Sequence, residues 1–218
     1  MTSGVRPATL AMIIGFVTAF SGTITACTIA PAPAGAPDAG AVSELPPPGF
    51  GTMLQSEVSL SLTSRDLQIL VTPLSESVTR ATAPDTYERL SGIARANLGS
   101  TPPGSTLFLV SFFTEEVDVR FIPEEVQLIS GGLRVLPLAI QPITPSWGQR
   151  RVQQRRTEMA VYAFPSGVDL ESDLILVYGF DQTAQWSAIL PRIQGERARA
   201  RARAGIGQAS RPYLEIFR

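Results

Sequence analysis

The sequence contains no histidine and no lysine, and its single cysteine is Cys27. Without histidine there is no Ser-His or Cys-His pair, and the most common acid–base side chain of enzymes is missing. Without lysine there is no Schiff base and no Ser-Lys pair. Zinc, copper and haem sites lose their usual ligands, and one cysteine cannot form a disulfide within the chain. Carboxylate catalysis and oxygen-ligated calcium are the chemistries that remain.

Positive charge comes from arginine alone and is unevenly distributed. The chain has 18 basic and 19 acidic residues, which gives a net charge of −1. Residues 192–218 hold seven arginines and two acids, whereas residues 49–191 hold ten arginines and fifteen acids. Because the chain as a whole is not basic, we expect no nucleic-acid partner. The C-terminal segment nevertheless forms a local basic region.

One long apolar run covers residues 7–26, carries no charge, follows Arg6 and ends directly before Cys27. A basic start, an apolar stretch and small residues at its end are typical of a secretory signal peptide. About 20 apolar residues are also enough to span a membrane. An uncleaved membrane helix and an ordinary secreted protein are therefore alternatives, although glycine, serine and threonine make this run only weakly hydrophobic.

The residues Ile24-Thr25-Ala26-Cys27 resemble the lipobox of a bacterial lipoprotein precursor. The resemblance covers residues 1–27 only. It implies that the signal peptide, residues 1–26, is removed and that lipid attached to the Cys27 thiol anchors the protein in a membrane outside the cytoplasm. Thr28 is not the aspartate that commonly retains lipoproteins in the inner membrane. In a host with two membranes, the resemblance therefore implies the outer membrane, facing the periplasm.

Residues 27–48 are rich in proline, alanine and glycine and end in Pro46-Pro47-Pro48. Such a composition buries no core and favours extended, solvated chain. A terminus without a function is the alternative, but a tether after a lipid-modified cysteine explains both the position and the composition. The sequence thus predicts a tether over 27–48 and a folded domain over 49–218 that carries the arginine-rich C-terminal segment.

Alternation of apolar and polar residues dominates the folded part and predicts a mainly β structure. The expected strands cover 57–63, 66–72, 106–113, 117–121, 124–130, 133–140, 157–164, 174–180 and 213–217. Gly131-Gly132 predicts a hairpin turn between two of them. Short, regularly spaced strands favour an antiparallel β-sandwich, of which the immunoglobulin-like arrangement is one form.

We also expect one or two helices at the periphery of the sandwich. Asp85, followed three residues later by Glu88, predicts a capping box and a helix over 85–98. Its apolar face would hold Tyr87, Leu90, Ala94 and Leu98. A second helix is expected to start near Ser187 and to run into the arginine repeat.

Two arginine-rich segments are candidate binding surfaces for an anionic polymer or an envelope protein, because guanidinium groups pair bidentately with phosphate and carboxylate. They are Arg150, Arg151, Arg155 and Arg156 in a loop, and Arg197, Arg199, Arg201 and Arg203 near the C-terminus. The second segment could also meet anionic lipid headgroups. The alternatives are a loop that pairs with the domain's own acids and a solvated helix, around which arginines at every second position would be spread.

Two acidic groups are further candidates. Residues 169–173 hold three carboxylates at alternate positions, which is a pattern that can bind Ca²⁺, although the glycine and distal glutamate of an EF-hand loop are missing. A second group could supply the carboxylate pair of a glycoside hydrolase; it consists of Glu115, Glu116, Asp118, Glu124 and Glu125. A solvated turn explains the first group equally well. Carboxylates placed like those of the second group are far more often solvent-facing, and few aromatic residues are present to line a sugar cleft, so we expect neither a metal site nor catalytic residues.

The sequence therefore predicts a lipid-anchored protein of the cell envelope with a structural or partner-binding role, no catalysis and no cofactor. A carboxylate-dependent hydrolase on the same scaffold is one alternative. A carrier with an apolar pocket for a small ligand, located between sheet and helix, is the other.

Overall fold

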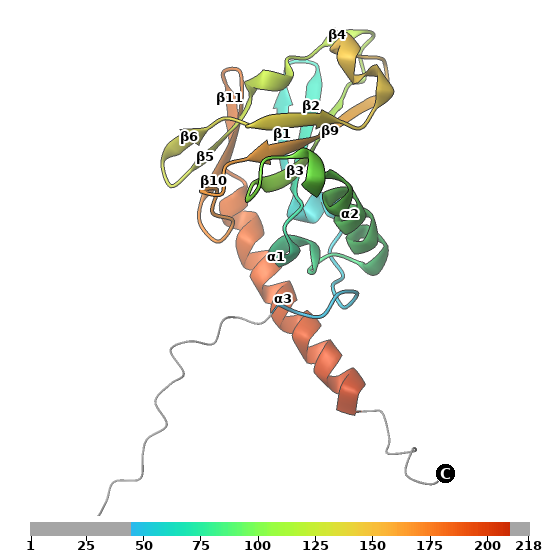
Figure 1. Ribbon diagram of the computed structural model, residues 1–218, viewed down its shortest axis with the longest axis vertical. Helices are drawn as coiled ribbons and strands as arrows, with labels where there is room; N and C mark the ends of the chain where they lie inside the picture. The colour runs from blue at the N-terminus through green and yellow to red at the C-terminus, as the bar shows by residue number, and fades with distance from the viewer. Residues whose placement is uncertain (1–44, 210–218) are drawn as a thin grey trace, which may run out of the picture. The chain divides into compact units, whose positions relative to one another are not determined.

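The computed structural model describes residues 45–209, in which eleven strands form three antiparallel sheets (Figure 1). The five-stranded sheet runs in the order β1 (Leu60–Ser64), β2 (Leu67–Pro73), β3 (Thr106–Phe113), β9 (Thr157–Phe164) and β7 (Ala139–Pro142). The four-stranded sheet runs in the order β11 (Asp181–Thr183), β10 (Leu174–Tyr178), β5 (Val126–Ser130) and β6 (Leu133–Val135). A short ribbon pairs β4 (Val119–Arg120) with β8 (Arg151–Val152).

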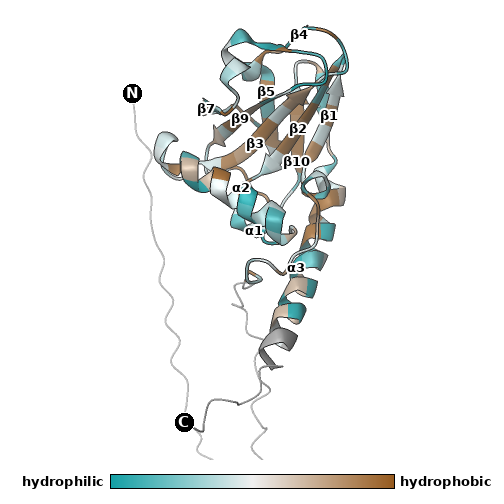
Figure 2. Cartoon of the chain, turned by 90° about the vertical axis from the view of Figure 1, so that its right-hand side faces the viewer, coloured by the Kyte–Doolittle hydropathy of each residue, from teal (hydrophilic) through white to brown (hydrophobic). Residues whose placement is uncertain are grey.

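The two larger sheets pack around a shared core that is rich in aromatic residues. Phe112 of β3 stacks on Phe121 with ring centroids 4.7 Å apart, and Trp147 packs edge-on against Phe121 at 4.9 Å. Figure 2 shows hydrophobic residues running along β2 and β3, between the other layers. Burial raises the pKa of the Tyr162 hydroxyl, which stays neutral and donates to the carbonyl of Pro123. These contacts confirm the expected antiparallel sandwich.

Strand β3 is covered on both faces, as its apolar sequence predicts. Phe108 and Val110 point into the core between the sheets, whereas Leu107 and Leu109 contribute to a second, smaller core. Helix α2 (Pro84–Asn97) closes that second core with Leu90, Ile93 and Ala94. The five-stranded sheet is therefore the middle layer, with the four-stranded sheet on one face and α2 on the other.

Helix α2 begins one residue earlier than predicted and has no capping box. Its N-cap is Ala83, without a side-chain cap, and Pro84 occupies the first turn, where its missing N–H has no partner to lose. Leu98 lies beyond the helix end and is 62% exposed. The apolar face is thus shorter than the one the sequence predicted.

Two further α-helices and four short 3-10 helices complete the described fold. Helix α1 (Glu76–Thr79) follows β2, and α3 (Trp186–Ala209) leaves the sandwich after β11, as the prediction of a helix near Ser187 requires (Figure 1). The 3-10 helices are η1 (Gln55–Val58), η2 (Leu98–Ser100), η3 (Pro123–Glu125) and η4 (Pro145–Gln149).

Several expected strand bounds are wrong. Residues 57 and 58 end η1 and Ser59 follows before β1, so the first strand is shorter than predicted. The Gly131-Gly132 hairpin is confirmed, with both glycines at positive φ. The expected strand 133–140 is divided between the two sheets as β6 and β7, and Pro137 lies at the break, where it cannot donate to a ladder.

The strand order also excludes the immunoglobulin-like form of the sandwich. In an immunoglobulin domain the third strand crosses to the sheet opposite the first two, whereas β3 here pairs with β2 in the same sheet. The predicted signal peptide, Cys27, most of the predicted tether and the expected strand 213–217 lie outside the described residues.

Candidate functional site

The arginine-rich loop and the second acidic group are brought together at one end of the sandwich. Three of its arginines pair with acids of that group: Arg150 with Glu124 at 2.6 Å, Arg151 with Asp118 at 2.5 Å and Arg155 with Glu115 at 3.0 Å. The Arg151 guanidinium, through its hydrogen bond, lowers the pKa of the Asp118 carboxyl. These pairs are exposed, so solvent screens them and each contributes little to the stability of the fold. Arg156 is exposed and makes no ion pair with another described residue.

The same end of the domain contains strained backbone. Among the described residues, four that are not glycine adopt a positive φ of 50–60°: Arg65, Asp118, Arg150 and Arg155. A side chain in this conformation costs about 1–2 kcal/mol. Such residues tend to concentrate at binding and catalytic sites. The four strained residues therefore make this end of the sandwich a candidate functional site.

A cleft of about 850 Å³ opens at this end and is built from three segments. They are the β1–β2 turn, the segment between β3 and β5 that contributes residues 116–120, Ile122 and Glu125, and the β10–β11 turn. The Ser64 hydroxyl donates to the Asp181 carboxylate at 2.6 Å and joins the first and third segments. The backbone N–H of Ile122 donates to the Tyr178 hydroxyl at 2.9 Å and joins the second and third. The walls are thus fixed to one another.

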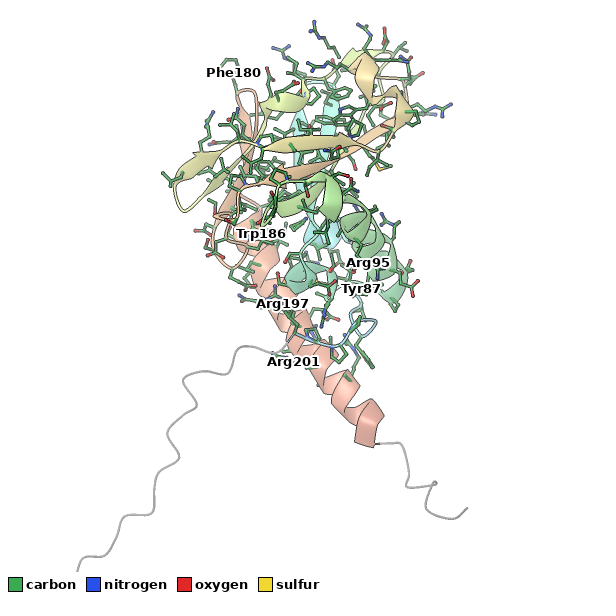
Figure 3. The ribbon with its side chains drawn as sticks, viewed as in Figure 1. Tyr87, Arg95, Phe180, Trp186, Arg197 and Arg201 are labelled. Carbon is green, nitrogen blue, oxygen red and sulfur yellow. The ribbon has the colours of Figure 1, made fainter. Side chains whose placement is uncertain are left out.

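The cleft is acidic and has apolar residues on its wall. Five carboxylates and two guanidinium groups line it: Asp66, Glu116, Asp118, Glu125 and Asp181 against Arg65 and Arg120. Phe180, at the β10–β11 turn, is 104% exposed, and Val117 is 69% exposed. Figure 3 shows the Phe180 side chain at the end of the domain far from Arg197 and Arg201.

The calcium candidate at residues 169–173 lies outside the cleft lining. Asp169 accepts a hydrogen bond from the backbone N–H of Glu171, and Glu171 pairs with Arg197 at 2.7 Å. Within residues 45–209, no group of three or more His, Cys, Asp or Glu side chains is arranged to hold a metal ion.

The second arginine segment lies on α3, so its arginines occupy a helix and not an extended chain. One face of this helix is buried at intervals of three and four residues, through Trp186, Ile189, Ile193, Glu196, Ala200 and Ala204. Arg197 reaches across to α1, where its Nε donates to the Ser77 carbonyl at 2.5 Å. Arg199 and Arg203 flank Glu196, whereas Arg201 is exposed.

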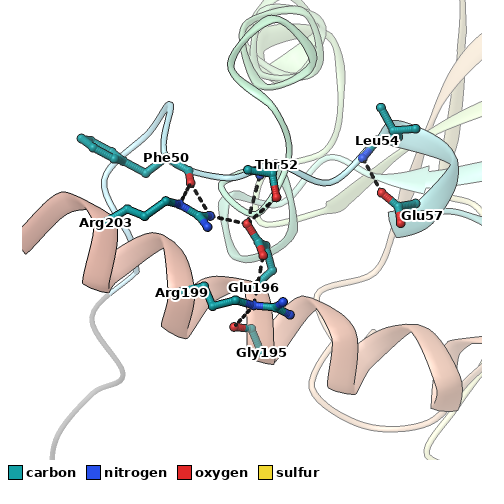
Figure 4. A network of polar contacts seen from close by, with 8 residues as sticks. All are labelled: Phe50, Thr52, Leu54, Glu57, Gly195, Glu196, Arg199 and Arg203. Carbon is teal, nitrogen blue, oxygen red and sulfur yellow. Dashed lines mark hydrogen bonds and ion pairs between the residues drawn. The ribbon is translucent and has the colours of Figure 1, made fainter.

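Glu196 is the only acid in the arginine repeat and fastens the helix to residues 45–53, which we call the N-terminal strap (Figure 4). Its carboxylate accepts hydrogen bonds from the Thr52 N–H at 3.1 Å, from the Thr52 hydroxyl at 2.8 Å and from Arg203. Arg203 also donates to the Phe50 carbonyl at 2.6 Å. Burial raises the pKa of Glu196, but its hydrogen bonds with Thr52 and Arg203 outweigh burial, and the pKa is lowered.

The strap is held on its other side as well. Arg80 donates to the Pro46 carbonyl at 3.2 Å, and the Met53 N–H donates to the Ala81 carbonyl at 3.1 Å. Gly51 is buried against this backbone, so closely that a Cβ at its position would lie 2.3 Å from the Ala81 carbonyl carbon. The chain therefore enters the described domain between α3 and the residues after α1.

Sequence reasoning missed the cleft, Phe180 and the role of Glu196. Phe180 reads as the end of a strand, because it follows an apolar run. One sequence feature could have indicated the role of Glu196: it is a lone carboxylate at helical spacing from the arginines with which it pairs. The cleft combines three segments that are distant in sequence, and no local pattern indicates their meeting.

Comparison with known proteins finds no family model, no curated protein and no solved structure that matches this chain. Within residues 45–209, no helix is both long and apolar enough to cross a membrane.

Proposed function

We propose that this chain is a lipid-anchored protein of the bacterial cell envelope whose domain binds a partner and catalyses no reaction. The lipobox-like residues that end in Cys27 support the anchor. The proline-rich residues after it support a tether between membrane and domain. In a host with two membranes, the protein would be held in the outer membrane and face the periplasm.

The observation that carries the proposal is the course of the strap. The chain enters the domain beside the arginine-rich half of α3, and the cleft lies at the far end (Figures 3 and 4). A domain tethered from that side presents its basic end to the membrane, where anionic headgroups attract arginine by about 1 kcal/mol for each residue near the surface. The cleft then faces away from the membrane, toward other envelope components.

The anchor is tested by Cys27→Ser in a bacterial host that processes lipoproteins, with Thr28→Ser as the matched control. The wild type and the control should incorporate labelled palmitate and sediment with the membranes. The Cys27→Ser protein should lose the label and leave the membrane fraction at high pH. Unchanged fractionation and labelling of Cys27→Ser would contradict the anchor.

The arginine-rich loop is tested separately as a partner surface. Glutamine replaces Arg150, Arg151, Arg155 and Arg156 together, and Arg89→Gln with Arg95→Gln on α2 is the control pair. If the loop contributes to partner binding, the first variant loses proteins from a pull-down of envelope extract at low salt and the control does not. An identical set of captured proteins would remove the loop from the binding surface.

A carboxylate-dependent hydrolase is the second candidate, because three residues of the acidic group, Glu116, Asp118 and Glu125, line the cleft. Turnover of chromogenic glycosides that disappears in Glu116→Gln or Glu125→Gln would favour it over the binding role. The small-ligand carrier has less support. Helix α2 packs directly on the sheet through Leu90, and neither of the two hollows described for this domain lies between them.

A further inference from the structure

We infer that the cleft binds a cationic peptide segment, one that presents arginine or lysine side chains next to an apolar side chain. The inference names the partner chemistry of the proposed function and rests on it. Three features of the cleft carry it: an aromatic side chain held in solvent, an excess of carboxylates, and walls that are fixed before binding.

Phe180 buries no surface in the folded domain, since the residue is fully exposed. The turn that carries it is well defined, with Gly179 at a φ of +58° and the Tyr178 hydroxyl bonded to the Ile122 backbone. Val117 adds a second exposed apolar side chain on the wall of the same cleft. Aromatic side chains, phenylalanine among them, are enriched in the cores of protein–protein interfaces. An apolar side chain of the partner is the natural contact for Phe180.

The charge of the cleft selects a cationic partner. Its five carboxylates exceed its two guanidinium groups by three. Arg151 compensates Asp118 from outside the cleft, whereas Glu116 and Glu125 have no ion-pair partner among the residues described. Complementary charge accelerates association and fixes orientation. A negatively charged polymer or lipid headgroup would meet repulsion here.

The walls of the cleft are cross-linked before any partner arrives. Besides the Ser64–Asp181 and Ile122–Tyr178 bonds, the Thr114 hydroxyl donates to the Asp66 carbonyl at 2.7 Å and holds the β1–β2 turn to the end of β3. A preformed site loses less conformational freedom when it binds. An extended peptide can therefore bind without rearrangement of these turns.

The test uses residues 28–218, because all described residues, 45–209, belong to one compact unit that contains both cores. The probe is a fluorescein-labelled nonapeptide of alternating arginine and leucine with a central tryptophan. One matched probe has citrulline in place of arginine, and another has serine in place of leucine and tryptophan. Fluorescence polarisation measures the affinity of each at low and physiological salt.

We expect the cationic apolar probe to bind and the two matched probes to bind at least tenfold more weakly. Phe180→Ser should weaken binding at least tenfold. Glu116→Gln with Glu125→Gln should weaken it about fivefold and reduce its salt dependence. The control pair, Glu88→Gln on α2 with Leu98→Ser just after it, removes an exposed acid and an exposed apolar residue that do not line the cleft, and should change the affinity less than twofold.

Absence of binding, equal binding of the citrulline probe, or wild-type affinity in Phe180→Ser would each overturn the inference. Self-association of the domain that Phe180→Ser abolishes, measured by sedimentation, would also overturn it in favour of a second copy of the chain. None of these results depends on Cys27, so a failed cleft leaves the lipid anchor standing, and a failed anchor leaves the cleft standing.

Discussion

Replacement of Glu196 should detach the N-terminal strap from α3 and reveal what the strap contributes to stability. The side chain is 5% exposed, and its carboxylate joins Thr52, Arg199 and Arg203. Hydrogen bonds to a charged group stabilise a fold by about 1.5–3 kcal/mol each. The two arginine side chains are 66% and 40% exposed, so water compensates much of their loss. We therefore expect Glu196→Ala to lower the free energy of unfolding by about 2–3 kcal/mol.

Glu196→Gln keeps the volume and one acceptor oxygen, so its cost should be smaller, at about 1–2 kcal/mol. Urea unfolding of residues 28–218 measures both values through the fluorescence of the buried Trp147 and Trp186. Glu88→Ala is the control, since Glu88 is exposed on α2 and should change stability by less than about 0.5 kcal/mol. A Glu196→Ala protein that matches this control would refute the role assigned to the network.

The same network predicts a pH dependence with a definite sign. The pKa of Glu196 is lowered in the folded protein, so the carboxylate stabilises the fold at pH values above the unfolded pKa of about 4.3. That contribution is lost as the pH falls through the folded pKa. The stability difference between wild type and Glu196→Gln should therefore be constant above about pH 5.5 and shrink below it. A difference that grows on acidification would contradict the argument.

Other predictions concern packing and charge. Gly51→Ala should destabilise the domain by about 2–3 kcal/mol, because the new methyl group meets the Ala81 backbone. Gly92→Ala in α2 has open space around it and should stabilise the domain by about 0.5–1 kcal/mol. Urea unfolding measures both changes. Trp186→Ala should cost about 3–5 kcal/mol in the same assay, since the side chain is fully buried. Glutamine at Arg150, Arg151, Arg155 and Arg156 should free Asp118 in the cleft wall and two further carboxylates, Glu115 and Glu124. Binding of the cationic probe should then tighten severalfold in fluorescence polarisation. Weaker binding of that probe would contradict the screening role of the loop.

Elements with strong local patterns could be predicted from the sequence. Strands β3 and β9 match their predicted bounds, because continuous or alternating apolar residues and a flanking turn define each of them. Helix α3 was also expected, with a start near Ser187 and a course into the arginine repeat. Ala200 and Ala204 are four residues apart and lie on the buried face of the helix. They place this part of the arginine repeat against the domain.

Features that depend on distant partners could not be predicted. Residues 133–140 are divided between two sheets because β6 pairs with β5 and β7 pairs with β9. The pairing of the arginine-rich loop with the acidic group was one of two open interpretations, and only the approach of β4 to β8 brings the two together. The cleft requires the meeting of turns more than 100 residues apart, such as those of Ser64 and Asp181.

The strap gives the domain a defined response to mechanical load. A pull on the chain from its N-terminal side acts first on the bond between Arg80 and Pro46, then on the contact of Arg203 with Phe50 and on the Thr52 bonds to Glu196. The parallel bridge between Met53 and Thr82 follows, before β1 is reached. Tension is thus transferred in steps to α3 and to the residues after α1. We therefore expect the β-sandwich and its cleft to bear load only after these contacts have broken.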